Sequence, residues 1–270
     1  MWYHGFGDAF MTKEQLKLQL ADQDLLPTDT VAIHTSLRAV GPIEGGADGL
    51  IDAFCEYLCD GLFLVPTHTW DSVNAAQPVY DAARTVPCIG AVPTAAAFRG
   101  DGVRSLHPTH SMWAHGMAAA EYIQGEELAK TPAAPNGCWG RLADVGAKIL
   151  LIGVDNSKNT FIHALDELAA LPDRRGPSYE TTMRSADGQI FHGQMSPHFC
   201  SRCSDVSKYY VNFEEALTAT GAQRFGRLGQ AQVRIVDAAA CRNTILRIYQ
   251  RADHDICIGP ETLPAALYLP

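Results

Sequence analysis

The stretch Lys148-Ile-Leu-Leu-Ile-Gly-Val154 is the strongest strand pattern in the sequence. Its apolar run, bounded by a glycine, predicts a buried β-strand. A helix is expected after it over residues 160–171, and Pro172 ends that helix because proline cannot continue it. A strand followed directly by a helix indicates an α/β fold.

The N-terminal half repeats this alternation. Thr12 and Gln15 form a capping box that predicts the start of a first helix, which runs to about residue 21. The elements expected after it are a strand at 30–37, a helix at 47–58, a strand at 61–66, an irregular stretch at 72–87, a helix at 91–98, a strand at 112–114 and a helix at 139–145.

The chain becomes richer in strands after residue 177. A hairpin is predicted around Asp187-Gly188, followed by a helix at 206–217, a strand at 229–236 and a helix that Asp237 caps. We therefore expect a layered α/β/α fold with a central mixed sheet and a smaller, β-richer C-terminal part. Residues 1–270 form one domain in this interpretation, with a core at about 10–176 and a C-terminal subdomain at about 177–270.

Composition restricts the possible functions. The formal net charge of −9 argues against nucleic acid as a partner, because phosphates require a basic surface, and it is compatible with a cationic substrate. The first residues lack the pattern of a signal peptide, and no apolar stretch approaches the ~20 residues of a membrane span. We expect a cytoplasmic protein, monomeric or homodimeric, that does not bind membranes.

The eight cysteines are scattered except for Cys200 and Cys203, and we expect reduced thiols rather than a disulfide framework. The spacing of His198, Cys200 and Cys203 resembles that of metal ligands. A structural zinc site normally needs four ligands, and the sequence offers one Cys-x-x-Cys pair. No metal is therefore expected, although a metal at Cys200 and Cys203 remains an alternative.

Polar loops follow three predicted strands, and a fourth polar loop surrounds Pro108. Ligands of open α/β sheets bind at the carboxyl ends of strands, so these loops predict a binding site, the alternative being ordinary turns. The four loops are His34-Thr-Ser-Leu-Arg38, Thr67-His-Thr-Trp-Asp71, Arg104-Ser-Leu-His-Pro-Thr-His-Ser111 and Asp155-Asn-Ser-Lys-Asn-Thr160.

His163 is the best candidate for a general base. It lies in the first turn of the helix after the strongest strand, and Asp166 and Glu167 follow at spacings that share its helical face. A carboxylate bonded to one ring nitrogen fixes the tautomer and leaves the other nitrogen free to accept a proton. On spacing alone, a buried histidine beside a surface acid is the more common arrangement.

The order of these pieces resembles the aminoglycoside 3-N-acetyltransferase family. The resemblance covers about residues 10–250, and no single piece decides it. The matching pieces are Ile33-His-Thr-Ser-Leu-Arg-Ala-Val-Gly41, Glu44-Gly-Gly46, Gly61-Leu-Phe-Leu-Val-Pro-Thr67, Arg104-Ser-Leu-His-Pro-Thr-His-Ser111, Trp139-Gly-Arg-Leu142, Ile149-Leu-Leu-Ile-Gly-Val154 and Asn159-Thr-Phe-Ile-His163.

The resemblance implies an antibiotic-resistance enzyme that transfers acetyl from acetyl-CoA to the 3-amino group of an aminoglycoside. His163 would be the base in a ternary complex, with Asp166 or Glu167 as its partner. The residues expected to bind CoA are Thr35, Ser36, Leu37, Arg38, Ser105 and His107. Asn159, Asp71 and Asp205 are the expected contacts of the substrate.

Alternatives remain at this point. Ser157 stands where many family members have an acid, so the acceptor could be a different amine. The chain could also be a non-catalytic protein that binds CoA or another ligand. A third alternative is a metal-dependent hydrolase built on a histidine cluster, whose members would be His68, His107, His110, His115 and His163.

Overall fold

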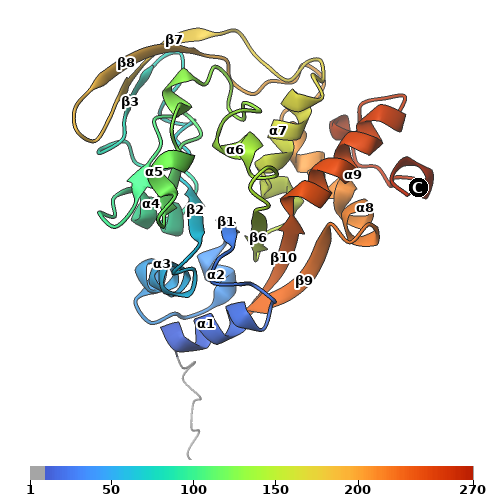
Figure 1. Cartoon of the computed structure of the whole chain (residues 1–270). Helices are drawn as coiled ribbons and strands as arrows, with labels where there is room; N and C mark the ends of the chain where they lie inside the picture. Colours follow the sequence, from blue (N-terminus) through green and yellow to red (C-terminus); the bar gives the residue numbers. More distant parts are fainter. Residues whose placement is uncertain (1–9, 270) are drawn as a thin grey trace, which may run out of the picture.

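The computed structural model describes residues 10–269. A seven-stranded mixed sheet lies at its centre with helices on both faces, and a three-stranded sheet stands at one end of the molecule (Figure 1). The prediction of a layered, mixed α/β fold is confirmed. The N-terminal segment that was expected not to be a signal peptide lies outside the described residues.

The large sheet has the strand order β4-β5-β2-β1-β6-β10-β9. Its three central strands are parallel to one another, and each strand outside them is antiparallel to its neighbour. The strands are β1 (Thr30–Thr35), β2 (Leu62–Pro66), β4 (Val103–Arg104), β5 (Met112–His115), β6 (Lys148–Ile152), β9 (Gln223–Leu228) and β10 (Ala231–Asp237).

The central position of β6 explains its apolar sequence. Ile149 and Leu151 pack into the core on one face of the sheet, whereas Leu150 and Ile152 pack into the core on the other face. All four side chains have no exposed surface. Successive side chains of a strand point to opposite faces, so a strand that is covered on both sides needs an unbroken apolar run.

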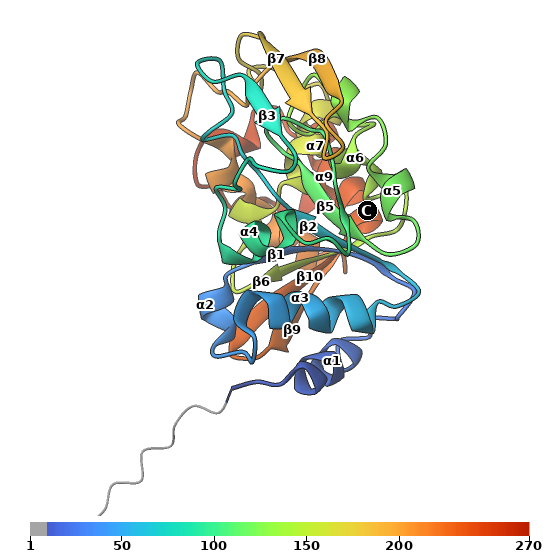
Figure 2. The same cartoon turned by 90° about the vertical axis from the view of Figure 1, so that its left-hand side faces the viewer.

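Two groups of helices cover the sheet. Figure 2 shows α1 and α3 together on one side of it. Their face of the core is completed by α2 and α4, and the opposite core is built with α5, α6, α7, α8 and α9. The helices are α1 (Lys13–Ala21), α2 (Leu37–Val40), α3 (Gly46–Tyr57), α4 (Ala91–Ala97), α5 (Ala119–Tyr122), α6 (Cys138–Arg141), α7 (Phe161–Leu168), α8 (Glu214–Ala219) and α9 (Ala238–Arg251).

The predicted start of α1 is confirmed in detail. The hydroxyl of Thr12 accepts a hydrogen bond from the backbone N–H of Gln15, and the Gln15 side chain accepts one from the backbone N–H of Thr12. This reciprocal capping satisfies two N–H groups that have no partner inside the helix. The predicted cap of α9 is also present, because the carboxylate of Asp237 accepts from the N–H of Ala240.

The three-stranded sheet has the order β3-β7-β8. β7 (Tyr179–Arg184) and β8 (Ile190–Met195) form the predicted hairpin, with Gly188 at φ +90° in its turn. β3 (Val79–Asp81) pairs with β7 and lies in the stretch that was expected to be irregular, so that expectation was wrong there. Three residues without alternation give too weak a pattern to be recognised.

The C-terminal part is divided between the two sheets. β7 and β8 belong to the small sheet, whereas β9 and β10 extend the large sheet beside β6. The sequence predicted β10 but not β9. The helix expected at 206–217 is a 3₁₀ segment, η3 (Val206–Phe213), followed by α8. The other 3₁₀ segments are η1 (Glu126–Leu128), η2 (Asn156–Lys158), η4 (Ile256–Ile258) and η5 (Ala265–Leu267).

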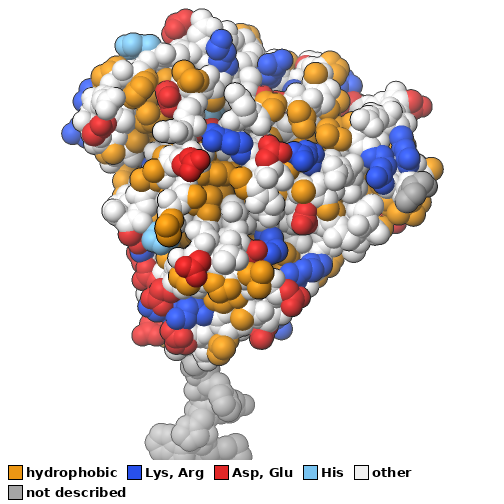
Figure 3. Space-filling view, viewed as in Figure 1, with side chains coloured by type: hydrophobic (Ala, Val, Ile, Leu, Met, Phe, Trp, Pro, Cys, Tyr) orange, Lys and Arg blue, Asp and Glu red, His pale blue; other side chains and the backbone are white. Residues whose placement is uncertain are grey.

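The surface carries charges of both signs. Acidic and basic side chains are interspersed over the face shown in Figure 3. The formal net charge of −9 therefore does not arise from one uniform acidic coat on that face. Within residues 10–269, no helix combines the length and the apolar character needed to span a membrane.

Candidate active site

A cavity of about 630 Å³ lies at the carboxyl ends of the parallel strands. The end of β1, the loop after β2 and the loop after β6 all contribute to its wall. Ligands bind at this edge in open α/β sheets, because the loops that follow parallel strands meet there. The wall residues from these three places are His34, Thr35, Pro66, His68, Trp70, Val154, Ser157, Lys158, Asn159 and Thr160.

His163 lines this cavity from the first turn of α7. The loop after β6 brings it there through η2, which Asp155 caps by accepting from the N–H of Ser157. Asn159 also lines the cavity and is 1% exposed. Its side-chain N–H donates to Asn156 at 3.3 Å, whereas its buried carbonyl oxygen has no partner in the part of the chain that the structure describes. The loop thus places an imidazole and a free amide oxygen in the same wall.

A tyrosine stands between His163 and Asp166. The hydroxyl of Tyr210, on η3, lies 2.7 Å from Nδ1 of His163 and 2.7 Å from Oδ2 of Asp166. The two residues therefore share a helical face as predicted, but they are connected through Tyr210 rather than by a direct hydrogen bond. Tyr210 is fully buried, and burial raises the pKa of its hydroxyl well above the ordinary value.

Asp166 is the centre of a buried polar network. It is 1% exposed, and it accepts hydrogen bonds from the hydroxyls of Tyr210 and Tyr249 and from Nε of Arg174 at 3.1 Å. Arg174 is itself buried and donates to Asp255 at 2.6 Å. Burial raises the pKa of Asp166, while Arg174 and the two hydroxyls act in the opposite direction. Such a set of donors suits an ionised carboxylate, which can only accept.

The carboxylate of Glu167 contacts other residues than that of Asp166 does. Its carboxylate accepts from the hydroxyl of Thr131 and from the backbone N–H of Ala133. It is not among the residues that line the cavity, and no hydrogen bond joins it to His163. The two acids therefore make different contacts, since Asp166 is connected to His163 through Tyr210 and Glu167 bonds to Thr131 and Ala133.

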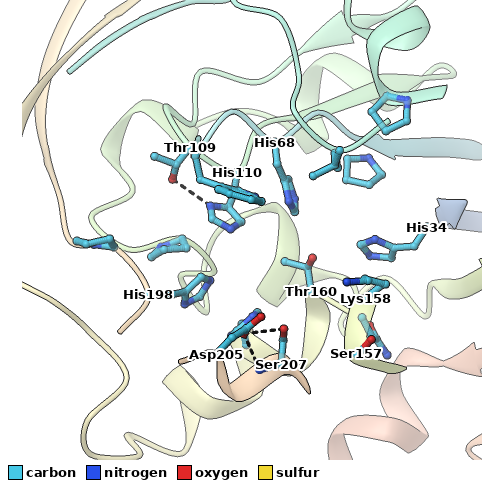
Figure 4. A pocket seen from close by; sticks show the side chains of 18 of the residues that line it. His34, His68, Thr109, His110, Ser157, Lys158, Thr160, His198, Asp205 and Ser207 are labelled. Carbon is cyan, nitrogen blue, oxygen red and sulfur yellow. Dashed lines mark hydrogen bonds between the residues drawn. The ribbon is translucent and has the colours of Figure 1, made fainter. Parts of the chain in front are cut away.

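Four further histidines surround the cavity: His34, His68, His110 and His198 (Figure 4). His198 stacks on His163 with ring centroids 3.8 Å apart, and its segment is held by a β-bridge to Arg175. Burial lowers the pKa of His34 to about 3 and that of His198 to about 4. Burial also lowers the pKa of His163 well below its ordinary value. The cavity wall is therefore rich in neutral imidazoles.

The histidines do not form a chelating group. Within residues 10–269, one set of at least three potential metal ligands brings its ligand atoms within 4.8 Å of one another: Cys55, Asp101 and His115. None of these three lines the cavity. The Asp101 carboxylate is also engaged by the guanidinium of Arg99. Among the described residues, the cavity therefore holds no ligand set of the kind that the hydrolase alternative requires, and Cys200 and Cys203 belong to none.

The residues expected to bind CoA are divided by the fold. Thr35 lines the cavity, and its buried hydroxyl oxygen has no hydrogen-bond partner within residues 10–269. Ser36, Leu37 and Arg38 follow at the start of α2, where Arg38 is exposed and has no ion pair with a described residue. Gly153 makes room for this turn, because a Cβ at its φ of +65° would lie 2.3 Å from the Cβ of Ala39.

Ser105 and His107 lie outside the cavity wall. The Ser105 hydroxyl accepts from the N–H of Met112. Nε2 of His107 donates to the carbonyl of Thr131 at 2.9 Å, and its Nδ1 accepts from the backbone N–H groups of the following loop. Both ring nitrogens are therefore used in holding that loop.

Two of the three expected substrate contacts line the cavity, namely Asn159 and Asp205, and Asp71 does not. Asp71 is exposed next to Trp70, which does line it. Asp205 is also exposed, and its carboxylate caps η3 by accepting from the N–H and hydroxyl of Ser207 (Figure 4). It is the one acidic residue of the cavity wall that the structure describes.

Comparison with known proteins identifies the family. A family model described as aminoglycoside 3-N-acetyltransferase matches residues 32–250. The chain belongs to this family. The resemblance predicted this family and its enzyme class, and both are confirmed.

Members of the family resemble the chain along most of its length. Aminoglycoside N(3)-acetyltransferase III of Salmonella sp is 28% identical over 233 residues, which cover 79% of each chain. The solved structure of AAC-VIa bound to sisomicin has a TM-score of 0.77 at 25% identity and covers 91% of this chain and 99% of that one. The AAC-IIIb binary complex with CoASH has a TM-score of 0.75 at 23% identity, over 87% and 94% of the two chains.

Sequence reasoning did not select three residues that lie in the cavity wall or contact His163: Tyr210, His198 and Lys158. Lys158 is exposed in the cavity wall and lies within the polar loop that the sequence singled out, so that signal was available. The sequence spacing of His198 suggests only a metal ligand. Tyr210 is 47 residues from His163 along the chain, and no local pattern connects them.

Proposed function

We propose that the protein transfers the acetyl group of acetyl-CoA to the 3-amino group of an aminoglycoside, in a ternary complex with His163 as the general base. The observation that carries the proposal is the environment of His163. The residue lines the cavity, its Nδ1 is bonded internally to Tyr210, and Nε2 has no hydrogen bond to a described residue. Family membership and the CoASH complex of AAC-IIIb support acetyl-CoA as the cosubstrate.

The chemistry requires one base that later acts as an acid. The amine nitrogen attacks the thioester carbonyl carbon as its proton passes to Nε2 of His163. The C–S bond then breaks, and the imidazolium returns the proton to the departing sulfur, so the products are the N-acetylamine and CoA thiol. The low pKa of His163 keeps the imidazole neutral and able to accept a proton at neutral pH.

Thr35 is the proposed contact of acetyl-CoA within the cavity, because its buried hydroxyl oxygen has no hydrogen-bond partner among the described residues. Lys158 and Arg38 are exposed cations on the two loops that flank this point, and neither has an ion pair with a described residue. Cations of this kind suit the phosphate groups of CoA. On the acceptor side, Asp205 and the free carbonyl oxygen of Asn159 are the proposed acceptors for ammonium and hydroxyl groups.

A thiol-release assay tests this function. Purified protein with acetyl-CoA and gentamicin or apramycin should release CoA thiol, and mass spectrometry should show one added acetyl group. His163→Ala should lower kcat by ~10²- to 10⁴-fold, the usual contribution of a general base. His254→Ala is the matched control, since His254 is an exposed histidine that pairs with Asp253 and Glu261 outside the cavity. Full activity of His163→Ala would exclude the mechanism.

One observation favours a second class of acceptor, an amine with fewer positive charges, in the same acetyl-transfer reaction. Within the described part of the cavity wall, Asp205 is accompanied by no other carboxylate, and Lys158 adds a positive charge. An aminoglycoside carries several ammonium groups, and each one that loses water without gaining an anionic partner weakens binding. The assay panel therefore includes amines with a single positive charge. A higher kcat/KM for these than for gentamicin would assign the enzyme to a less charged acceptor.

A further inference from the structure

The position of Tyr210 has a consequence for the proton on His163. We propose that Tyr210 is a positioning residue that holds His163 as the Nδ1–H tautomer, so that the lone pair on Nε2 is available to the substrate amine. The inference rests on the proposed function, in which His163 is the base. It concerns a residue 47 positions away from that histidine in the sequence.

The hydrogen of the Tyr210 hydroxyl has two possible acceptors, Asp166 and His163. A hydroxyl carries one hydrogen, and Oδ2 of Asp166 at 2.7 Å and Nδ1 of His163 at 2.7 Å compete for it. Bonds to an ionised acceptor are roughly twice as strong as those between neutral groups, so the hydrogen points at Asp166. The hydroxyl oxygen then has lone pairs directed at Nδ1 of His163, and only an N–H can satisfy them.

The surroundings keep Asp166 an acceptor. Nε of Arg174 donates to the same oxygen that Tyr210 contacts, and Tyr249 donates to the other oxygen. All these donors would lose their partner if Asp166 rotated away. Because the pKa of Tyr210 is raised well above its ordinary value, its hydroxyl keeps its hydrogen at neutral pH. The chain of bonds therefore has one direction, from His163 through Tyr210 to Asp166.

The arrangement resembles the third member of a hydrolytic triad, which orients a histidine from behind. Here a tyrosine hydroxyl touches the imidazole and the carboxylate lies one step further away. The stacking of His198 at 3.8 Å restricts the ring plane, whereas Tyr210 is the one described residue that forms a hydrogen bond with Nδ1. Ring orientation and tautomer are thus controlled by different residues.

Nitrogen NMR of the histidine side chains tests the tautomer without any substrate. The wild-type spectrum at pH 7.5 should show His163 with its proton on Nδ1, and the signal is assigned by its loss in His163→Gln. Tyr210→Phe should move that proton to Nε2, at least in part. A wild-type His163 protonated on Nε2 would overturn the proposal.

Tyr249→Phe is the matched control. It also removes a tyrosine hydroxyl from Asp166, but it has no hydrogen bond to His163. Tyr210→Phe should lower kcat by about 10- to 100-fold, the range found for partners that orient metal-bound histidines, with little change in the KM for acetyl-CoA. Tyr249→Phe should keep the tautomer and lose far less kcat. Equal losses in the two variants would mean that Tyr210 is only structural.

The wild-type spectrum tests the tautomer even where Tyr210→Phe folds poorly, and a rescue variant tests whether the loss of kcat comes from the missing contact with His163. Asp166→Glu lengthens the acid by one methylene and should carry the carboxylate toward the place that the hydroxyl leaves empty in Tyr210→Phe. The double variant should therefore regain Nδ1–H and part of the lost kcat. If wild-type His163 is the Nδ1–H tautomer but the wild type transfers no acetyl group, the proposed function is refuted and the positioning role of Tyr210 stands. If the wild type transfers acetyl but the tautomer is unchanged in Tyr210→Phe, the positioning role is refuted and the proposed function stands.

Discussion

The hydroxyl of Tyr210 lies 2.7 Å from Nδ1 of His163 and occupies the position that a carboxylate was expected to hold. Asp166 reaches the histidine only through this hydroxyl. The negative charge of Asp166 is therefore separated from the imidazole by the Tyr210 hydroxyl. Its effect on the basicity of His163 is weaker than that of a carboxylate in direct contact. The burial of His163 consequently determines the direction of its pKa shift.

His163 should remain neutral at pH 6. Burial, followed by the neighbouring His198, His68 and Arg174, lowers the pKa of His163 well below the ordinary value of 6.5. Titration of the imidazole by NMR should show no protonation of His163 between pH 8 and pH 6. His254 provides the contrast, because Asp253 and Glu261 raise its pKa above 6.5. A midpoint for His163 at or above 6.5 would contradict the prediction.

Stability should fall as the pH decreases below about 6.5. His34 has a pKa of about 3 in the folded protein, against an ordinary value of 6.5. Between these two values the unfolded chain binds a proton that the folded protein does not, so the contribution of His34 is fully present above pH 6.5 and is lost as the pH falls toward 3. One such group changes the free energy of unfolding by up to about 1.4 kcal/mol per pH unit.

Urea unfolding of the wild type and of His34→Gln at pH 8, 6 and 5 measures this contribution. The variant should lose less stability than the wild type between pH 8 and pH 5. His198, with a pKa of about 4, acts in the same direction and remains in both proteins, so the comparison isolates His34. Identical pH slopes would show that His34 has the same pKa in the folded and unfolded protein, which would contradict the prediction.

Substitution of Asp166 should lower kcat, whereas substitution of Glu167 should leave kcat largely unchanged. Asp166→Asn places an amide where Tyr210 needs an acceptor, so the hydroxyl can turn its hydrogen toward Nδ1 of His163 and favour the wrong tautomer. We expect kcat to fall by about 10- to 100-fold. Glu167→Gln changes a carboxylate that contacts Thr131 and Ala133, and it should cost about 1 kcal/mol of stability rather than turnover. Steady-state kinetics and thermal unfolding of both variants separate the two roles.

Asp205 should affect the affinity for a cationic acceptor. Asp205→Asn removes the charge but keeps a good N-cap for η3, because asparagine caps helices about as well as aspartate. An exposed ion pair contributes at most about 1 kcal/mol, so the KM for the amine should rise by up to about fivefold and kcat should change little. The increase should shrink at high salt, where the charge is screened. Asp253→Asn, an exposed acid outside the cavity wall, is the control.

The sequence predicted the elements that have strong local signals. The capping box of Thr12 and Gln15 fixed the start of α1, and the turn at Asp187-Gly188 gave the hairpin of β7 and β8. The apolar run at β6 required a strand covered on both faces. β9 was missed, because most of its residues between Gln223 and Leu228 are polar or exposed, so the strand has no continuous apolar pattern.

The sequence by itself determined the fold class through hydrophobic periodicity, and the resemblance of its ordered motifs to a known family indicated the family and His163 as the candidate base. Tertiary structure alone decided what surrounds that base. Spacings of three and four residues place Asp166 and Glu167 equally well on the face of His163, and only the packing of α7 turns one toward Tyr210 and the other toward Thr131. The contact of Tyr210 with His163 joins residues 47 positions apart, and a contact at that separation leaves no trace in local periodicity.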